Sequence, residues 1–287
     1  MREWLINFPQ WLHLDFTDDI DAFMRYLNIH YSDFFAIFKG FLNTFIGLVY
    51  QVIAHIPWWL FIIMVMAAAR RLTGRAKSAA LYGAMLMAVG IFGYWEMMNE
   101  TLSVVITAVF FSLLFGFPVG VFVSTARRAE AWLRPVLDAM QTMPVFVYMI
   151  PAVMLMGPGK APAVLATFVY SVVPVIRLTS HGIRQVDPEV TEAAKAFGSS
   201  RWQTLLKVQI PQAKPTIMAG VNQTMMMTVG MVVTCAMIGA NGLGMEVLIA
   251  INRTESGRGI IAGASIVIIA IIIDRLTQAM SKERRAG

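Results

Sequence analysis

Long runs of apolar residues without a formal charge dominate the middle and the end of the chain. Residues 78–95, 101–126, 216–245 and 259–273 contain no Asp, Glu, Lys or Arg. A helix needs about 20 apolar residues to cross the hydrocarbon core of a bilayer, and most of these runs approach that length. The pattern predicts an all-α polytopic membrane protein. We expect about seven transmembrane helices, at residues 56–70, 78–95, 102–125, 136–156, 161–180, 215–239 and 259–280.

The N-terminal part is less regular. Residues 1–31 are mixed in polarity and carry an acidic cluster from residue 15 to residue 21. Residues 32–54 place polar side chains among aromatic ones, which favours an amphipathic helix lying along the membrane interface. A crossing helix is the alternative, because residues 40–69 have no formal charge, but His55 and Pro57 interrupt that run. Residues 1–10 lack the pattern of a secretory signal peptide, so we expect the chain to be inserted by its own spans.

Composition and charge agree with a membrane protein and orient it. Hydrophobic residues make up 57% of the chain and charged residues 14%, which is too little charge to cover a soluble protein of this size. The net charge of +6 reflects basic loops rather than a nucleic-acid surface. Sixteen basic residues fall on one predicted side: Arg70, Arg71, Arg75, Lys77, Arg127, Arg128, Arg134, Arg177, Arg184, Lys195, Arg201, Lys207, Lys214, Lys282, Arg284 and Arg285. Only Lys160, Arg253 and Arg258 fall on the other, so we expect the N-terminus outside and the C-terminal tail, residues 282–287, in the cytoplasm.

A polar segment at residues 181–214 interrupts the apolar pattern with its own helix signals. Asp187 and Pro188 form a helix start, and Gly198 stands where a left-handed residue would end that helix. Ser199 or Ser200 would cap a second helix, Arg201–Gln209, which we expect Pro211 to stop. The segment is either an ordinary amphipathic loop or a surface presented to a partner.

The spacing within this segment carries a resemblance to a known family. It resembles the "EAA" loop of permease subunits of binding-protein-dependent ABC importers. That loop has the order Glu-Ala-Ala, three residues, Gly, nine residues, an aliphatic residue, any residue, an aliphatic residue and Pro. Here those positions are Glu192, Ala193, Ala194, Gly198, Val208, Ile210 and Pro211. The resemblance implies a type I permease fold in a bacterial inner membrane. It also implies that residues 189–197 dock on a separate ATPase, which would bind ATP and Mg in two copies.

Further partners follow from the same resemblance. It implies an extracytoplasmic substrate-binding protein and a second copy of the permease. It divides the chain into an N-terminal segment (1–55), peripheral helices (56–95) and a permease core (96–281).

A second candidate element lies in the predicted span 136–156. Pro144 and Pro151 both remove backbone donors from an apolar helix, which predicts either a broken helix beside the translocation pathway or a simple kink. The candidate pathway residues are Gln141, Thr142, Met143, Pro144, Tyr148 and Pro151, together with Asn222 and Thr224 in the run 216–245. The segment 140–151 and the glycine-rich stretch 239–244 resemble permeases for glycine betaine and related quaternary ammonium solutes. This resemblance covers roughly residues 95–280 and implies import of glycine betaine or proline betaine in osmoprotection.

Other functions find less support in the residues. The glycines at 239–244 lack dinucleotide-binding spacing, and residues 157–160 are no P-loop, so we expect no ATP hydrolysis by this chain. The four histidines are scattered, and Cys235 is single, which gives no metal site or disulfide. Two alternatives remain: a permease of the same class for choline, carnitine or an amino acid, and an ion-coupled secondary transporter. The latter would be expected to bury acidic residues in 216–245 or 259–273, where there are none. Asp138 is either functional or locally neutralised. The same choice applies to Asp274 and Arg275, which are consecutive residues of the last span.

Overall fold

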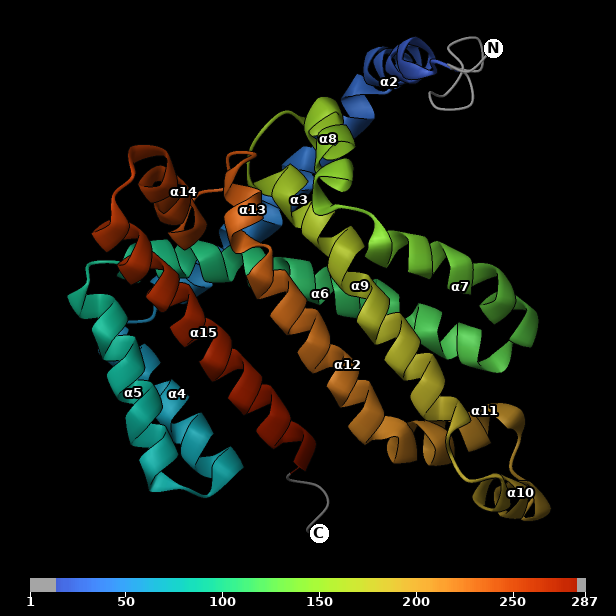
Figure 1. Ribbon diagram of the computed structural model, residues 1–287. Coiled ribbons are helices and arrows are strands. Elements are labelled where there is room, and N and C mark those ends of the chain that lie inside the picture. Colours follow the sequence, from blue (N-terminus) through green and yellow to red (C-terminus); the bar gives the residue numbers. More distant parts are fainter. Residues whose placement is uncertain (1–13, 283–287) are drawn as a thin grey trace, which may run out of the picture.

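The computed structural model describes residues 14–282, so the start of the chain and most of the predicted tail 282–287 lie outside the described residues. Helices, and no strand, make up the regular structure of this part (Figure 1). They are α2 (Thr17–His30), α3 (Ser32–Ala54), α4 (Trp58–Thr73), α5 (Ala76–Ile91), α6 (Trp95–Thr125), α7 (Arg127–Thr142), α8 (Val145–Met156), α9 (Lys160–Arg184), α10 (Pro188–Ala196), α11 (Arg201–Thr204), α12 (Ile210–Gly230), α13 (Val232–Ala236), α14 (Leu243–Arg253) and α15 (Ser256–Lys282). A single π-turn, Leu205–Gln209, joins α11 to α12.

The core consists of α6, α9 and α12 in close contact. α6 and α9 run in the same direction. Glu100 pairs with Lys160 near the N-terminal ends of both helices, and further along both of them the Ser112 and Ser171 hydroxyls lie 3.0 Å apart. α12 runs the opposite way, and the Thr224 hydroxyl donates to the Ser171 carbonyl at 2.9 Å. Small residues allow this approach, as expected for helices packed in a membrane.

Gly120 shows how tight the contact between α6 and α9 is. A Cβ at this position would lie 2.7 Å from the Thr179 Cβ and 2.8 Å from the Ile176 carbonyl oxygen. We expect Gly120→Ala to lower the free energy of unfolding by about 1–3 kcal/mol, because backbone must move to admit the methyl group. Gly40→Ala on α3 is the control, since a Cβ there meets nothing within 4 Å. Thermal unfolding of the purified protein in detergent compares the two, and equal midpoints would contradict the expectation.

The chain turns at two ends of the helical bundle (Figure 1). The basic end comprises the α4–α5 turn, the α6–α7 junction, α10, α11 and the C-terminal end of α15. The opposite end comprises the α8–α9 turn, α13 and α14, where the Gly159 amide donates to the Ile238 carbonyl at 2.8 Å. The basic loops within residues 14–282 therefore lie at one end of the bundle, as expected.

Among the described residues, fewer helices are long and apolar enough to cross a membrane than the seven expected. By length and hydropathy alone, four helices could cross a membrane: α3, α6, α9 and α15, with the bent α7–α8 pair as a fifth. The multi-pass prediction is confirmed, and the expected span 136–156 contains a break, since α7 and α8 meet at 92°.

α3 is long and apolar enough to cross a membrane, and it packs obliquely against α6, with Phe45 against Phe110 and Ile53 close to Val105. Just before α3, the Asn28 side chain donates to the Met154 carbonyl at 3.4 Å, close to the α8–α9 turn. Further along α3, the ring of Tyr50 lies under the Lys160 ammonium, 5.7 Å from it. The helix runs across the direction of α9 and α12 in Figure 1. The oblique course of α3 fits the expected interfacial helix, and its length and hydropathy fit the crossing alternative, so the choice between the two stays a prediction.

Candidate functional site

α10 is a short, fully capped helix at the basic end. The Asp187 carboxylate accepts the Glu189 amide at 2.9 Å, and Pro188 occupies the first turn, as predicted. At its C-terminal end the Gly198 amide donates to the Lys195 carbonyl at 2.9 Å, and the Ser199 amide donates to the Ala194 carbonyl at 3.1 Å. These two bonds form a Schellman motif, which requires a left-handed residue. Gly198 supplies it with φ of +85°.

α11 begins with a reciprocal capping box. The Gln203 amide donates to the Ser200 hydroxyl at 3.3 Å, and the Ser200 amide donates to the Gln203 side chain at 2.8 Å. The predicted helix–turn–helix is therefore present, with Ser200 as the cap of the second helix.

Pro211 does not stop the second helix, so that expectation is wrong. The π-turn carries the chain into α12, with the Ile210 amide bonding to the Leu205 carbonyl. A π-turn shifts the hydrogen-bond register by one residue. Pro211 then falls in the first turn of α12, where its missing donor is tolerated.

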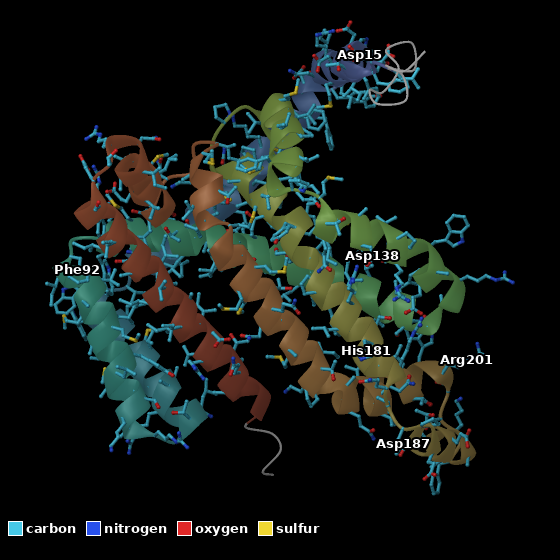
Figure 2. All side chains as sticks on the ribbon, viewed as in Figure 1. Asp15, Phe92, Asp138, His181, Asp187 and Arg201 are labelled. Carbon is cyan, nitrogen blue, oxygen red and sulfur yellow. The ribbon has the colours of Figure 1, made fainter. Side chains whose placement is uncertain are left out.

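The polar segment is anchored at its base and exposed at its tip. Val186 and Leu205 are buried with α9 and α12 side chains, which fixes where the segment leaves the bundle. No residue of α10 is buried, and the side chain of Phe197 is 92% exposed. The side chain of Trp202 on α11 is also exposed, at 69%. Figure 2 shows Asp187 and Arg201 at this extremity, far from Asp15 on the N-terminal side.

A cleft of about 560 Å³ separates α10 from α11. Its lining residues are Thr125, Thr191, Lys195, Arg201, Trp202, Thr204, Leu205 and Gln209. The lining includes two basic residues, Lys195 and Arg201, and the indole of Trp202. The matched motif positions are not among its lining residues. Glu192, Ala193 and Pro211 are exposed, and Ala194, Val208 and Ile210 are partly buried.

The second candidate element is an elbow at residues 142–145, between α7 and α8. Met143 is extended, with ψ of 130°, as the residue before a proline tends to be. Pro144 has no N–H for the Met140 carbonyl one turn earlier, and the Tyr148 hydroxyl donates to that carbonyl instead. Pro151 lies inside α8 and does not break it. A broken helix is thus present, and only the first proline causes it.

Ion pairs fix α7 on the core. Asp138 pairs with Arg177 of α9, and Glu130 pairs with Arg184, which also donates to the Val123 carbonyl at 2.6 Å. Figure 2 shows Asp138 beside α9. Asp138 is therefore a neutralised residue that holds two helices together.

A polar cluster joins α12 to α15. One oxygen of the Asp274 carboxylate accepts the Asn222 amide at 2.8 Å and the Gln278 amide at 2.7 Å. Asp274 makes no ion pair with Arg275 in the described residues, because consecutive residues of a helix point to different faces. The expected local pair is thus replaced by two side-chain amides.

Comparison with known proteins identifies the family. Residues 108–286 match the model of the binding-protein-dependent transport system inner membrane component. The chain belongs to this family.

Relatives with assigned functions extend over most of this permease. It is 41% identical over 261 residues to the glycine betaine/carnitine transport permease protein GbuB of Listeria monocytogenes, covering 87% of this chain and 92% of that protein. It is 38% identical to the glycine betaine transport system permease protein OpuAB of Bacillus subtilis, covering 94% of this chain and 95% of that protein. The glycine betaine/proline betaine transport system permease protein ProW of Escherichia coli is 48% identical over 70% of this chain and 57% of its own length.

A solved structure shares the fold. A chain of the MetNI methionine ABC transporter, in an inward-facing conformation, superposes with a TM-score of 0.57 at 20% identity, covering 69% of this permease and 96% of that chain. The predicted type I permease fold is confirmed.

The sequence-predicted pathway residues separate into two groups in this permease. Met143, Pro144 and Tyr148 meet at the elbow, with Gln141 and Thr142 just before it. Asn222 faces α15, and Thr224 is fully buried against α9, where it bonds the core helices. Their contribution to a pathway stays a prediction.

Sequence reasoning missed several residues of these sites. Met140 could have been found by counting one turn back from Pro144, and Gln278 by its spacing of four from Asp274. Trp202 could not be found in this way, because the exposure of an apolar side chain depends on the fold, whereas Phe197 lies within the segment 189–197 that the resemblance places on the ATPase.

Asp274 offers a direct test of the cluster between α12 and α15. We expect Asp274→Leu to lower the free energy of unfolding by about 1–3 kcal/mol, because the Asn222 and Gln278 amides lose their acceptor. Asp274→Asn keeps an acceptor oxygen and is expected to cost less. Chemical or thermal unfolding in detergent measures both, and an equal loss in the two variants would argue that charge, not hydrogen bonding, matters here.

Proposed function

We propose that this permease is the transmembrane subunit of an ATP-driven importer for glycine betaine or a closely related quaternary ammonium solute. The observation that carries the coupled-importer part is the complete loop motif on an exposed, capped helix pair at the basic end. Support for the solute comes from the names of the relatives, which share glycine betaine. Osmoprotection is the corresponding role in the cell.

The α10–α11 segment would be the contact with a separate ATPase. Glu192, Ala193 and Ala194 give α10 a surface that a groove can approach closely, and Gly198 sets the angle to α11. Val208, Ile210 and Pro211 join α11 to α12, so movement of the docked segment would reach the core directly. ATP and Mg would bind to the ATPase, present in two copies.

The elbow and α12 would contribute to the translocation pathway. We place Gln141, Thr142, Met143, Pro144, Tyr148 and Pro151 there, with Asn222 and Thr224 on α12. A pathway between subunits requires a second copy of this permease, and an extracytoplasmic binding protein would deliver the solute. Residues 96–281 would form the permease core, residues 56–95 a peripheral hairpin and residues 1–55 an outer segment, with the N-terminus outside and the C-terminus in the cytoplasm of a bacterial cell.

Uptake of labelled glycine betaine tests the proposal. The permease is expressed with its ATPase and binding protein in cells without betaine carriers, and unlabelled carnitine, choline and proline betaine are added as competitors. We expect uptake that requires all three proteins. Uptake without the ATPase would overturn the coupled-importer assignment, and absence of betaine uptake by the complete system would overturn the solute.

A further inference from the structure

The Met140 carbonyl is an acceptor that the backbone leaves unpaired. In a continuous helix the amide of residue 144 would donate to it, but residue 144 is proline. The neighbouring amide of Met143 already donates to the Ala139 carbonyl at 2.9 Å. Within residues 14–282, the side-chain hydroxyl of Tyr148 is the donor that satisfies the Met140 carbonyl.

The two helices joined by this bond are held by different contacts. α7 is tied to α9 by the Asp138–Arg177 and Glu130–Arg184 ion pairs. α8 is held by apolar packing: Val145 packs in a cluster with Ala163 of α9, while Phe146 and Ile150 are exposed on its outer face. The chain between them is extended at Met143. The Tyr148–Met140 hydrogen bond therefore spans the joint between a helix fixed by ion pairs and a helix fixed by apolar packing.

We propose that Tyr148 is the positioning residue that holds the elbow bent, and that its bond to Met140 breaks when α8 swings during transport. The inference rests on the proposed transport function, since alternating access supplies the movement. In apolar surroundings, leaving a carbonyl unsatisfied changes the ratio of two conformers by about 5- to 150-fold. If the Tyr148 hydroxyl bonds to Met140 only in the bent conformer, it raises the ratio of bent to open elbows by this factor.

Tyr148→Phe removes the hydroxyl and little else. Tyr82→Phe is the matched control, because Tyr82 is buried on α5 and its hydroxyl makes no hydrogen bond among the described residues. Both changes are made in a Cys235→Ser background with spin labels at Trp132→Cys on α7 and Ile150→Cys on α8. The labelled copy is diluted with unlabelled permease in the complex with ATPase and binding protein, so that distances report one chain.

The expected result is a loss of the bent α7–α8 distance in Tyr148→Phe, with the ratio of bent to open elbows falling at least about fivefold. The distances in Tyr82→Phe should match those of the parent. Pro144→Ala restores a backbone donor for Met140 and should shift the ratio in the same direction, which also tests the inference if Tyr148→Phe does not assemble. Adding Tyr148→Phe to Pro144→Ala should then change little.

Two outcomes overturn the inference. One is an unchanged elbow distance in Tyr148→Phe, and the other is a full additional effect on the Pro144→Ala background, which would place the action of the hydroxyl elsewhere. Betaine uptake by the parent complex is measured in parallel. Absent uptake with the expected distance shift would overturn the proposed function alone, whereas normal uptake without the shift would overturn the role of Tyr148 alone.

Discussion

Replacing Gly198 by valine is expected to reduce betaine uptake by roughly a hundredfold while the permease remains in the membrane. The backbone at Gly198 has φ of +85°, where a β-branched side chain is strained. A Cβ there meets nothing within 4 Å, so the effect is one of backbone conformation and not of crowding. Strain of about 1–2 kcal/mol and weakening of the two Schellman hydrogen bonds together account for that magnitude.

Gly198→Asn is the control that isolates the backbone. Asparagine adopts left-handed conformations more readily than other residues, so this variant should retain most of the uptake. ATP hydrolysis by the reconstituted complex is measured beside uptake. Equal loss in the valine and asparagine variants would indicate that glycine is needed for close approach of the ATPase, and not for the turn between α10 and α11.

The helix caps of the polar segment could be predicted because they are local. Asp187 reaches the amide two residues on, and Ser200 and Gln203 satisfy each other across three residues. Interactions over such short separations are encoded in sequence spacing. The membrane character of the chain could also be predicted from the sequence. Its apolar runs carry no charge and approach the length of a bilayer-crossing helix, which is typical of membrane spans.

The two prolines of the broken helix show where local rules end. Pro144 and Pro151 look equivalent in the sequence, but only Pro144 ends a helix. α7 is held against α9 by Asp138 and Arg177, so the break falls where that attachment ends and where Tyr148 can reach the freed carbonyl. Pro211 does not end the second helix for a related reason. The π-turn before it shifts the hydrogen-bond register and so changes which carbonyl lacks a backbone partner.

The placement of α3 also depends on tertiary contacts. Its length and hydropathy are compatible with crossing, and its oblique course follows from its contacts with the rest of the bundle. Lys160 over the Tyr50 ring and Asn28 on the Met154 carbonyl hold it at one end of the bundle. Neither contact is visible in the spacing of residues along α3. The amides that surround Asp274 likewise come partly from α12, 52 residues away.

Phe197→Ala is expected to weaken binding of the ATPase by about 30- to 700-fold, or roughly 2–4 kcal/mol, without changing the fold. Phe197 is 92% exposed at the tip of the α10–α11 segment, so its ring buries almost none of its apolar surface against the described residues. Aromatic side chains that fill a pocket of a partner supply most of the binding energy of many interfaces. The dissociation constant of purified ATPase from the detergent-solubilised permease measures the effect.

Trp132→Ala separates this anchor from general surface hydrophobicity. Trp132 is 81% exposed on α7, outside the α10–α11 segment, so its removal takes away a larger aromatic surface without touching the proposed contact. Unchanged affinity in this variant, beside a large loss in Phe197→Ala, would locate the docking energy at the tip. A comparable loss in both would mean that the ATPase contacts α7 as well, and that α10 and α11 alone do not form its binding surface.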